Sequence, residues 1–267
     1  MALLEFSFQS DVLGFEQQLY AIPPDPRVLK IEEKGCADPS DLTVLYLLHG
    51  YHGNASDWVR CTMLTRFLEE SRKKIAVIMP AGLTYWYTDM VRGWKWYTYV
   101  AEEVPMIARS YLHISSRREN TYVAGMSMGG QGAVKLALRH PERYCMAASF
   151  SGSLDPATRS AEPGMTPQRI EEFANIYGED PASRFGTDDD LMALLEKAKQ
   201  PGAEMPKLYL SCGTADGLYP YNIKFRDKAV SLGYDVEFHE EEGVGHEWKF
   251  WNREVEKLID RIPAEPV

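Results

Sequence analysis

The sequence has 267 residues, of which 45% are hydrophobic and 25% are charged. This composition is typical of folded globular proteins and excludes a disordered chain, a collagen-like repeat or a coiled coil. Its 29 Lys and Arg against 39 Asp and Glu give a net charge of −10, an average field that repels nucleic acid and anionic membranes, so neither is predicted as a partner.

The first twenty residues lack the basic segment, apolar run and small-residue cleavage site of a secretory signal. No later apolar stretch approaches the roughly 20 residues that span a bilayer. The cysteines contain no C-x-x-C pair, and a chain of this length needs no disulfides. We therefore expect a cytoplasmic protein with reduced thiols at Cys36, Cys61, Cys145 and Cys212.

Strand-like and helix-like segments alternate along the chain, as in proteins with a mostly parallel sheet and crossover helices. Residues 3–8 and 17–22 alternate apolar with polar side chains before a Pro-rich break, which predicts an antiparallel hairpin at the sheet edge. Continuous apolar runs predict buried strands at 42–48, 75–79, 122–124, 145–150 and 208–210. Three- and four-residue apolar spacing predicts helices at 58–71, 100–113, 128–140, 219–231 and 247–260.

Residues 153–206 interrupt this alternation. The segment contains turn residues, an acidic run at 188–190 and short helical stretches at 169–177 and 191–199. We interpret it as a cap-like insertion within one domain rather than as a second domain.

The segment Gly125-Met126-Ser127-Met128-Gly129 is a G-x-S-x-G motif. An apolar strand runs directly into it and a helix leaves it, which is the strand–turn–helix of a nucleophile elbow. The flanking glycines permit a crowded, strained backbone that projects the serine hydroxyl. We predict Ser127 as a catalytic nucleophile; the alternative is a tight turn with an unreactive serine.

A serine nucleophile needs a base and an orienting carboxylate, and on an α/β-hydrolase sheet the chain order is Ser, acid, His. His246 lies in a loop before the last helix, whereas His239 lies inside an alternating strand, so His246 is the predicted base. Asp216 follows the 208–210 strand, where catalytic groups gather in open α/β sheets, and is the predicted acid. Asp155, which also follows a strand, is the alternative.

Acyl transfer also needs N–H donors for the developing oxyanion. The residue after the nucleophile supplies one by position, and a loop after an early strand supplies another. We predict the backbone N–H groups of Met128 and Tyr51 for this role. The histidines of that loop, His49 and His52, lack metal-ligand spacing, so no metal is predicted.

Five segments resemble a family of putative esterases that includes tributyrin esterases, esterase D/S-formylglutathione hydrolases and, more remotely, feruloyl esterases and mycolyltransferases. The likeness covers most of the chain and is closest to the tributyrin esterase branch, because of HGYHGN and HEWKFW. The S-G-L-T-C type of oxyanion loop expected of S-formylglutathione hydrolases is missing. The segments are LLHGYHGNASDW, YWYTDMVRGWKWYTYVAEEVP, GMSMGGQGAVKLALRHP, GTADGLY and GVGHEWKFW.

The resemblance implies one α/β-hydrolase domain over residues 1–267. It would have a mostly parallel central sheet with helices on both faces, an N-terminal antiparallel hairpin and a small cap-like insertion at about 153–206. The implied triad is Ser127, Asp216 and His246, with Tyr51 and Met128 as the oxyanion hole.

The implied activity is that of a serine carboxylesterase acting on short acyl esters, acetyl to butyryl, through an acyl-enzyme on Ser127; acetylated carbohydrates stay open as substrates. A small-molecule ester is the expected partner, no cofactor is expected, and a homo-oligomer stays open. The alternatives are a feruloyl or cinnamoyl esterase, an S-formylglutathione hydrolase-like thioesterase, an acyltransferase and a non-catalytic binding module.

Several ring-bearing residues are candidates for the walls of a substrate pocket. Aromatic rings offer rigid apolar surfaces and stack on sugar or aryl groups. Packing in the core and rim is the equal alternative for the tryptophans. The candidates are His52, Trp86, Trp94, Trp96 and Trp248.

Overall fold

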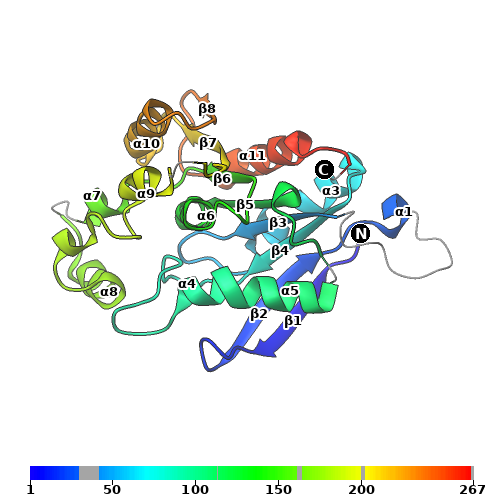
Figure 1. The fold of residues 1–267 in the computed structure, drawn as a ribbon, viewed down its shortest axis with the longest axis horizontal. Coiled ribbons are helices and arrows are strands. Elements are labelled where there is room, and N and C mark those ends of the chain that lie inside the picture. The colour runs from blue at the N-terminus through cyan, green and yellow to red at the C-terminus, as the bar shows by residue number, and fades with distance from the viewer. Residues whose placement is uncertain (30–41, 113, 161–163, 200–201, 266–267) are drawn as a thin grey trace.

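One eight-stranded sheet crosses the molecule in the order β1-β2-β4-β3-β5-β6-β7-β8 (Figure 1). Strands β3 to β8 pair in parallel, whereas β1 and β2 form an antiparallel hairpin that joins the sheet through β4. The predicted fold class is therefore confirmed. The strands are β1 (Leu4–Gln9), β2 (Glu16–Ile22), β3 (Thr43–Leu48), β4 (Ile75–Pro80), β5 (Thr121–Met126), β6 (Met146–Phe150), β7 (Lys207–Gly213) and β8 (Val236–Glu241).

The computed structural model describes residues 1–29, 42–112, 114–160, 164–199 and 202–265. Cys36 and His113 therefore lie outside the described residues. Within these ranges, no helix is long and apolar enough to cross a membrane.

The two faces of the sheet bury separate apolar clusters, because successive side chains of a strand point to opposite faces. In β3, Val44 and Tyr46 join one cluster, and Leu45 and Leu47 join the other. Residues of helices α5 (Val104–Leu112), α6 (Met128–Arg139), α9 (Leu191–Ala198) and α10 (Tyr219–Ser231) join the first cluster. Residues of α3 (Leu64–Ser71) and α11 (Trp248–Arg261) join the second.

The helix expected at 58–71 is two helices, α2 (Asp57–Cys61) and α3. Thr62 adopts an extended conformation between them. Its hydroxyl donates to the Trp58 carbonyl and accepts from the Leu64 N–H. A threonine side chain that bonds the backbone in this way competes with the helical pattern and ends the first helix.

The helix expected at 100–113 also differs from a regular α-helix. It begins with a wide π-helical turn, η2 (Tyr99–Glu103), before α5. Pro105 has no N–H to donate to the Ala101 carbonyl four residues earlier. That carbonyl accepts instead from Arg143 Nη1 at 3.1 Å, so proline explains the local change of helix type. The other short helices are α1 (Pro26–Leu29), α4 (Trp96–Thr98) and η3 (Arg118–Asn120).

The segment between β6 and β7 divides into two parts. Its last helix, α9, packs on α6 and α10 and so belongs to the layer that covers the sheet. The earlier helices lie beyond the carboxyl ends of the central strands (Figure 1). We call these earlier helices the cap: α7 (Pro156–Ser160), α8 (Pro167–Tyr177) and η4 (Pro181–Arg184).

Lys135, in the middle of α6, is a charged residue with almost no exposure to solvent. Its ammonium donates to the Tyr87 carbonyl at 3.1 Å and to Thr88 Oγ1 at 2.9 Å, and it forms an ion pair with Asp189. Burial lowers the pKa of Lys135, an effect that the Asp189 carboxylate partly offsets. This cation ties α6 to the loop after β4 and to the segment that leads into α9.

Replacing Lys135 by methionine is expected to lower the free energy of unfolding by about 3 kcal/mol, because the buried acceptors lose their donor. Urea denaturation followed by circular dichroism measures the change. The matched control is Lys228→Met on α10, whose ammonium pairs with Glu196 at the surface; it should cost less than about 1 kcal/mol. Equal effects of the two substitutions would contradict the role given to Lys135.

Candidate active site

Ser127 stands at the sharp turn between β5 and α6. Its φ of 55° lies in a region that non-glycine residues rarely adopt. Its N–H donates to the Phe150 carbonyl at 2.9 Å, and its carbonyl accepts from the Ser153 N–H at 3.2 Å. A Cβ on Gly125 would lie 2.4 Å from the carbonyl carbon of Gly129. The turn therefore has the tight, strained geometry expected of the motif, and it leaves the serine hydroxyl at the sheet edge.

Three side chains from separate loops form one line of hydrogen bonds at this edge. His246 Nε2 lies 3.0 Å from Ser127 Oγ, and His246 Nδ1 lies 2.7 Å from Asp216 Oδ2. Ser127 follows β5, Asp216 follows β7 and His246 follows β8. Because parallel strands end at the same edge, residues up to 119 positions apart meet there. The structure brings together all three residues predicted for the triad.

The Asp216 carboxyl is buried, and its two oxygens have separate partners. One faces His246, and the other accepts the Leu218 N–H at 2.8 Å. Burial alone would raise the pKa of Asp216, but the hydrogen bonds from His246 and Leu218 outweigh it and lower the pKa below its ordinary value. The carboxylate is therefore ionised at neutral pH and accepts a hydrogen bond from the N–H at His246 Nδ1.

The alternative base and acid have other partners. His239 lies in β8, with Nδ1 2.9 Å from a carboxylate oxygen of Glu254. The buried carboxylate of Asp155 pairs with Lys224 Nζ at 2.5 Å. Each of these two side chains therefore pairs with a residue other than the members of the predicted triad.

His49 shapes the loop that was predicted to supply an oxyanion donor. One ring nitrogen lies 2.8 Å from the Gly50 carbonyl, and the other accepts the Gly82 N–H at 2.8 Å. Burial lowers the pKa of His49, so the ring is neutral, as these two bonds require. Across the described residues, no three His, Cys, Asp or Glu side chains gather where they could hold a metal ion.

Tyr51 joins this loop to the cap. Its hydroxyl donates to Glu172 Oε2 at 2.7 Å, and the Arg169 guanidinium lies 4.2 Å from its ring centroid. Both partners belong to α8. The Met128 amide is at the start of α6, where the N–H groups of the first turn have no partner within the helix. Both predicted oxyanion residues therefore lie at the carboxyl edge of the sheet with Ser127.

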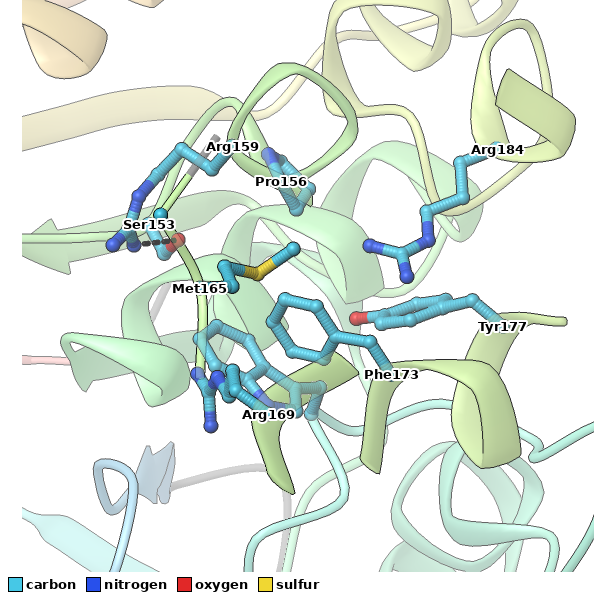
Figure 2. Close-up of a pocket in the computed structure, with 10 residues that line it drawn as sticks. Ser153, Pro156, Arg159, Met165, Arg169, Phe173, Tyr177 and Arg184 are labelled. Atoms are coloured by element: carbon cyan, nitrogen blue, oxygen red, sulfur yellow. Dashed lines mark hydrogen bonds between the residues drawn. The ribbon is translucent and has the colours of Figure 1, made fainter. Parts of the chain in front are cut away.

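A cavity of about 260 Å³ lies between the cap and Ser153. Figure 2 shows Phe173 and Tyr177 from α8 and Met165 from the preceding turn projecting into it. Ser153 bonds the backbone of Ser127 directly, so the cavity adjoins the serine. The cavity is therefore one residue removed from Ser127, through Ser153. It is lined by Trp86, Ser153, Pro156, Arg159, Gly164, Met165, Arg169, Phe173, Tyr177 and Arg184.

The candidate pocket residues fall in different places. Trp86 lines the cavity, and His52 lines a shallower groove on the other side of Arg169. Trp96 is 0% exposed and Trp94 packs on Phe15 at the rim, so these two follow the packing alternative and line neither space. Trp248 makes edge contacts with Trp58 and Trp251 and does not line the cavity.

The cap side chains of the cavity were not identified from the sequence as binding residues. A spacing signal was nevertheless present, since Arg169, Phe173 and Tyr177 follow one another at intervals of four in a predicted helix. Residues four apart share one helix face. That pattern marks the face of α8 that now borders the cavity.

Comparison with known proteins supports this fold and identifies the family. A family model for putative esterases matches residues 37–259. An acetyl esterase from Caldicellulosiruptor saccharolyticus is 32% identical over 271 residues, 97% of each chain. The substrate-bound structure of fluorophosphonate-binding serine hydrolase F from Staphylococcus aureus has a TM-score of 0.86 at 26% identity over 98% of each chain. The structure of the S. aureus S-formylglutathione hydrolase has a TM-score of 0.84 at 26% identity, again over 98% of each chain.

These matches confirm the resemblance at the level of the family and of serine esterase activity, while the special likeness to tributyrin esterases stays a prediction. The match runs through the loops that carry the serine, the carboxylate and the imidazole. This chain belongs to the putative esterase family and is a serine hydrolase that acts on carboxylic ester bonds.

Proposed function

We propose that this esterase hydrolyses small carboxylic esters in two steps, through an acyl-enzyme on Ser127. The observation that carries the proposal is the continuous line of hydrogen bonds from Ser127 Oγ through His246 to Asp216, at 3.0 and 2.7 Å. A serine hydroxyl is a poor nucleophile at neutral pH and needs this arrangement to react.

In the first step, His246 Nε2 takes the hydroxyl proton as Ser127 Oγ attacks the ester carbonyl. Asp216 accepts the Nδ1 hydrogen, which fixes the imidazole tautomer and stabilises the imidazolium that forms. The carbonyl oxygen gains negative charge and accepts hydrogen bonds from the backbone N–H groups of Tyr51 and Met128. The imidazolium then protonates the leaving alcohol, and the acyl group stays on Ser127.

In the second step, His246 takes a proton from water, which attacks the acyl carbon, and returns it to Ser127 Oγ as the acid leaves. His49 supports both steps as a positioning residue, because its two ring nitrogens hold the loop that carries Tyr51.

The proposed substrates are esters with short acyl groups, from acetyl to butyryl. The cavity of about 260 Å³ beside Ser153 is small, and a relative with nearly full coverage is an acetyl esterase. Acetylated carbohydrates fall within this class. We also propose a cytoplasmic location, supported by the exposed free thiol of Cys61, since oxidising compartments favour paired cysteines.

Ser127→Ala should lower kcat for p-nitrophenyl acetate by about 10⁴-fold or more, because no other group can form the acyl-enzyme. Steady-state kinetics measures the loss, and circular dichroism checks that the fold is retained. A fluorophosphonate probe should label the wild-type protein and leave this variant unlabelled. Activity near that of the wild type would refute the nucleophile.

Asp216→Asn should lower kcat near pH 7 by about 10⁴-fold, because an amide no longer selects the productive tautomer of His246. The lowered pKa keeps Asp216 ionised to a lower pH than an ordinary aspartate, so wild-type activity should not be lost by protonation of this carboxyl between pH 5 and 8. Asp155→Asn is the matched control, since its carboxylate faces Lys224, and it should stay within about threefold of wild type. The reverse ranking would make Asp155 the acid.

A panel of p-nitrophenyl esters tests the acyl preference. We expect kcat/KM to fall by at least about tenfold from butyrate to decanoate, because a long chain cannot be enclosed in so small a cavity. Methyl ferulate in the same panel tests the feruloyl alternative. A higher kcat/KM for the feruloyl ester than for acetyl esters would overturn the assignment of substrate class.

A further inference from the structure

The cavity between the cap and Ser153 is cationic in a protein whose net charge is −10. Its described lining includes three arginines, Arg159, Arg169 and Arg184, and none of the described lining residues is an aspartate or glutamate. Figure 2 shows their guanidinium groups around the same space that holds Met165 and Phe173. A lining of this composition attracts negative charge against the average field of the molecule.

The three arginines differ in how far their charge is already neutralised. Arg169 forms an ion pair with Glu172 at 2.9 Å, so it is compensated within α8. Arg159 donates to the neutral hydroxyl of Ser153 at 3.1 Å. Among the residues that the structure describes, neither Arg159 nor Arg184 lies within ion-pair distance of a carboxylate.

Arg184 gives the strongest indication that the cavity binds an anion. Its side chain is among the buried polar groups, 3% exposed, yet Nε and Nη1 have no hydrogen-bond partner among the described residues. The guanidinium lies 4.0 Å from the Tyr177 ring centroid and 4.8 Å from that of Phe173, and Figure 2 shows it pointing into the cavity. Buried donors are almost always paired, and an unpaired charged group is costly.

A purely structural role explains little of this arrangement. An arginine that serves the fold normally donates to carbonyls or carboxylates around it, as the partly buried Arg118 does with Pro141 and Glu204. The described contacts of the Arg184 guanidinium are instead with the rings of Phe173 and Tyr177. The Asp189 carboxylate that lies in its vicinity is already paired with Lys135.

We propose that Arg184 and Arg159 form an anion subsite of the active centre, so that preferred substrates are small esters that carry a carboxylate. A planar carboxylate matches the guanidinium geometry and would satisfy its free donors. The rings of Phe173, Tyr177 and Trp86 would hold the apolar part that links the carboxylate to the ester. This inference rests on the proposed function, because it assigns the substrate class of the same site.

The experiment compares ester pairs that share a carbon skeleton and in which one member carries a carboxylate. On the acyl side, the pair is p-nitrophenyl hemiglutarate against p-nitrophenyl pentanoate. On the alcohol side, it is 4-carboxyphenyl acetate against 4-carbamoylphenyl acetate. For at least one pair, kcat/KM of the wild-type protein should be at least about tenfold higher for the carboxylate, as expected when a buried charge gains a partner.

Substitution of Arg184 tests the residue itself. Arg184→Met should reduce the ratio of kcat/KM for carboxylate over neutral ester by at least about tenfold, and Arg184→Lys should restore part of it through the charge alone. Arg92→Met is the control, because Arg92 is an exposed arginine that pairs with Glu179 outside the cavity; it should leave the ratio unchanged. Should Arg184→Met fail to fold, competitive inhibition of the wild-type protein by glutarate but not by glutaramide replaces it.

Equal turnover of charged and neutral esters in both pairs would overturn the subsite, as would a preference that survives Arg184→Met, or the absence of glutarate inhibition. Labelling of Ser127 by the fluorophosphonate probe and turnover of p-nitrophenyl acetate report the ester chemistry separately. Their loss would refute the proposed function, whereas their persistence without charge preference refutes only the anion subsite.

Discussion

The geometry of the active edge depends on how closely helix α6 approaches strands β3 and β5. A Cβ on Gly129 would lie 2.4 Å from the carbonyl oxygen of Leu48, the last residue of β3. Glycine at this position lets the helix start directly against the sheet, and the chain then has to turn through Ser127 with a positive φ. This one close approach fixes the nucleophile, the first amide of α6 and the neighbouring loop of His49 relative to one another.

The sequence was sufficient to predict the triad because parallel strands convert chain order into spatial proximity. Ser127, Asp216 and His246 each directly follow a strand or the turn after it, so a common sheet edge brings them together regardless of their separation. The distinction between His246 and His239 rested on the same principle, since one lies in a loop and the other inside β8. The hairpin at the sheet edge was equally predictable from its alternating pattern.

The sequence did not predict features that depend on individual tertiary contacts. Periodicity alone could not show that the hydroxyl of Thr62 ends one helix, or that Arg143 supplies the bond that Pro105 cannot. The cationic cavity belongs to the same class. Its character comes from the turns that place Arg184 over Tyr177, and no spacing rule specifies those turns. Trp96 is an example of the opposite kind. The sequence made it a candidate for the pocket wall, but the structure buries it fully in the core.

The bond between Tyr51 and Glu172 crosses from the loop after β3 to helix α8 of the cap. This hydrogen bond therefore links the segment proposed to bind the substrate to the segment proposed to stabilise the oxyanion. A change of substrate selectivity should therefore also change the rate of turnover. A shift of α8 that admits a new substrate also moves the loop that carries the Tyr51 amide, because Glu172 of α8 is hydrogen-bonded to Tyr51. Relatives with different caps would consequently have to readjust this loop to recover their rate.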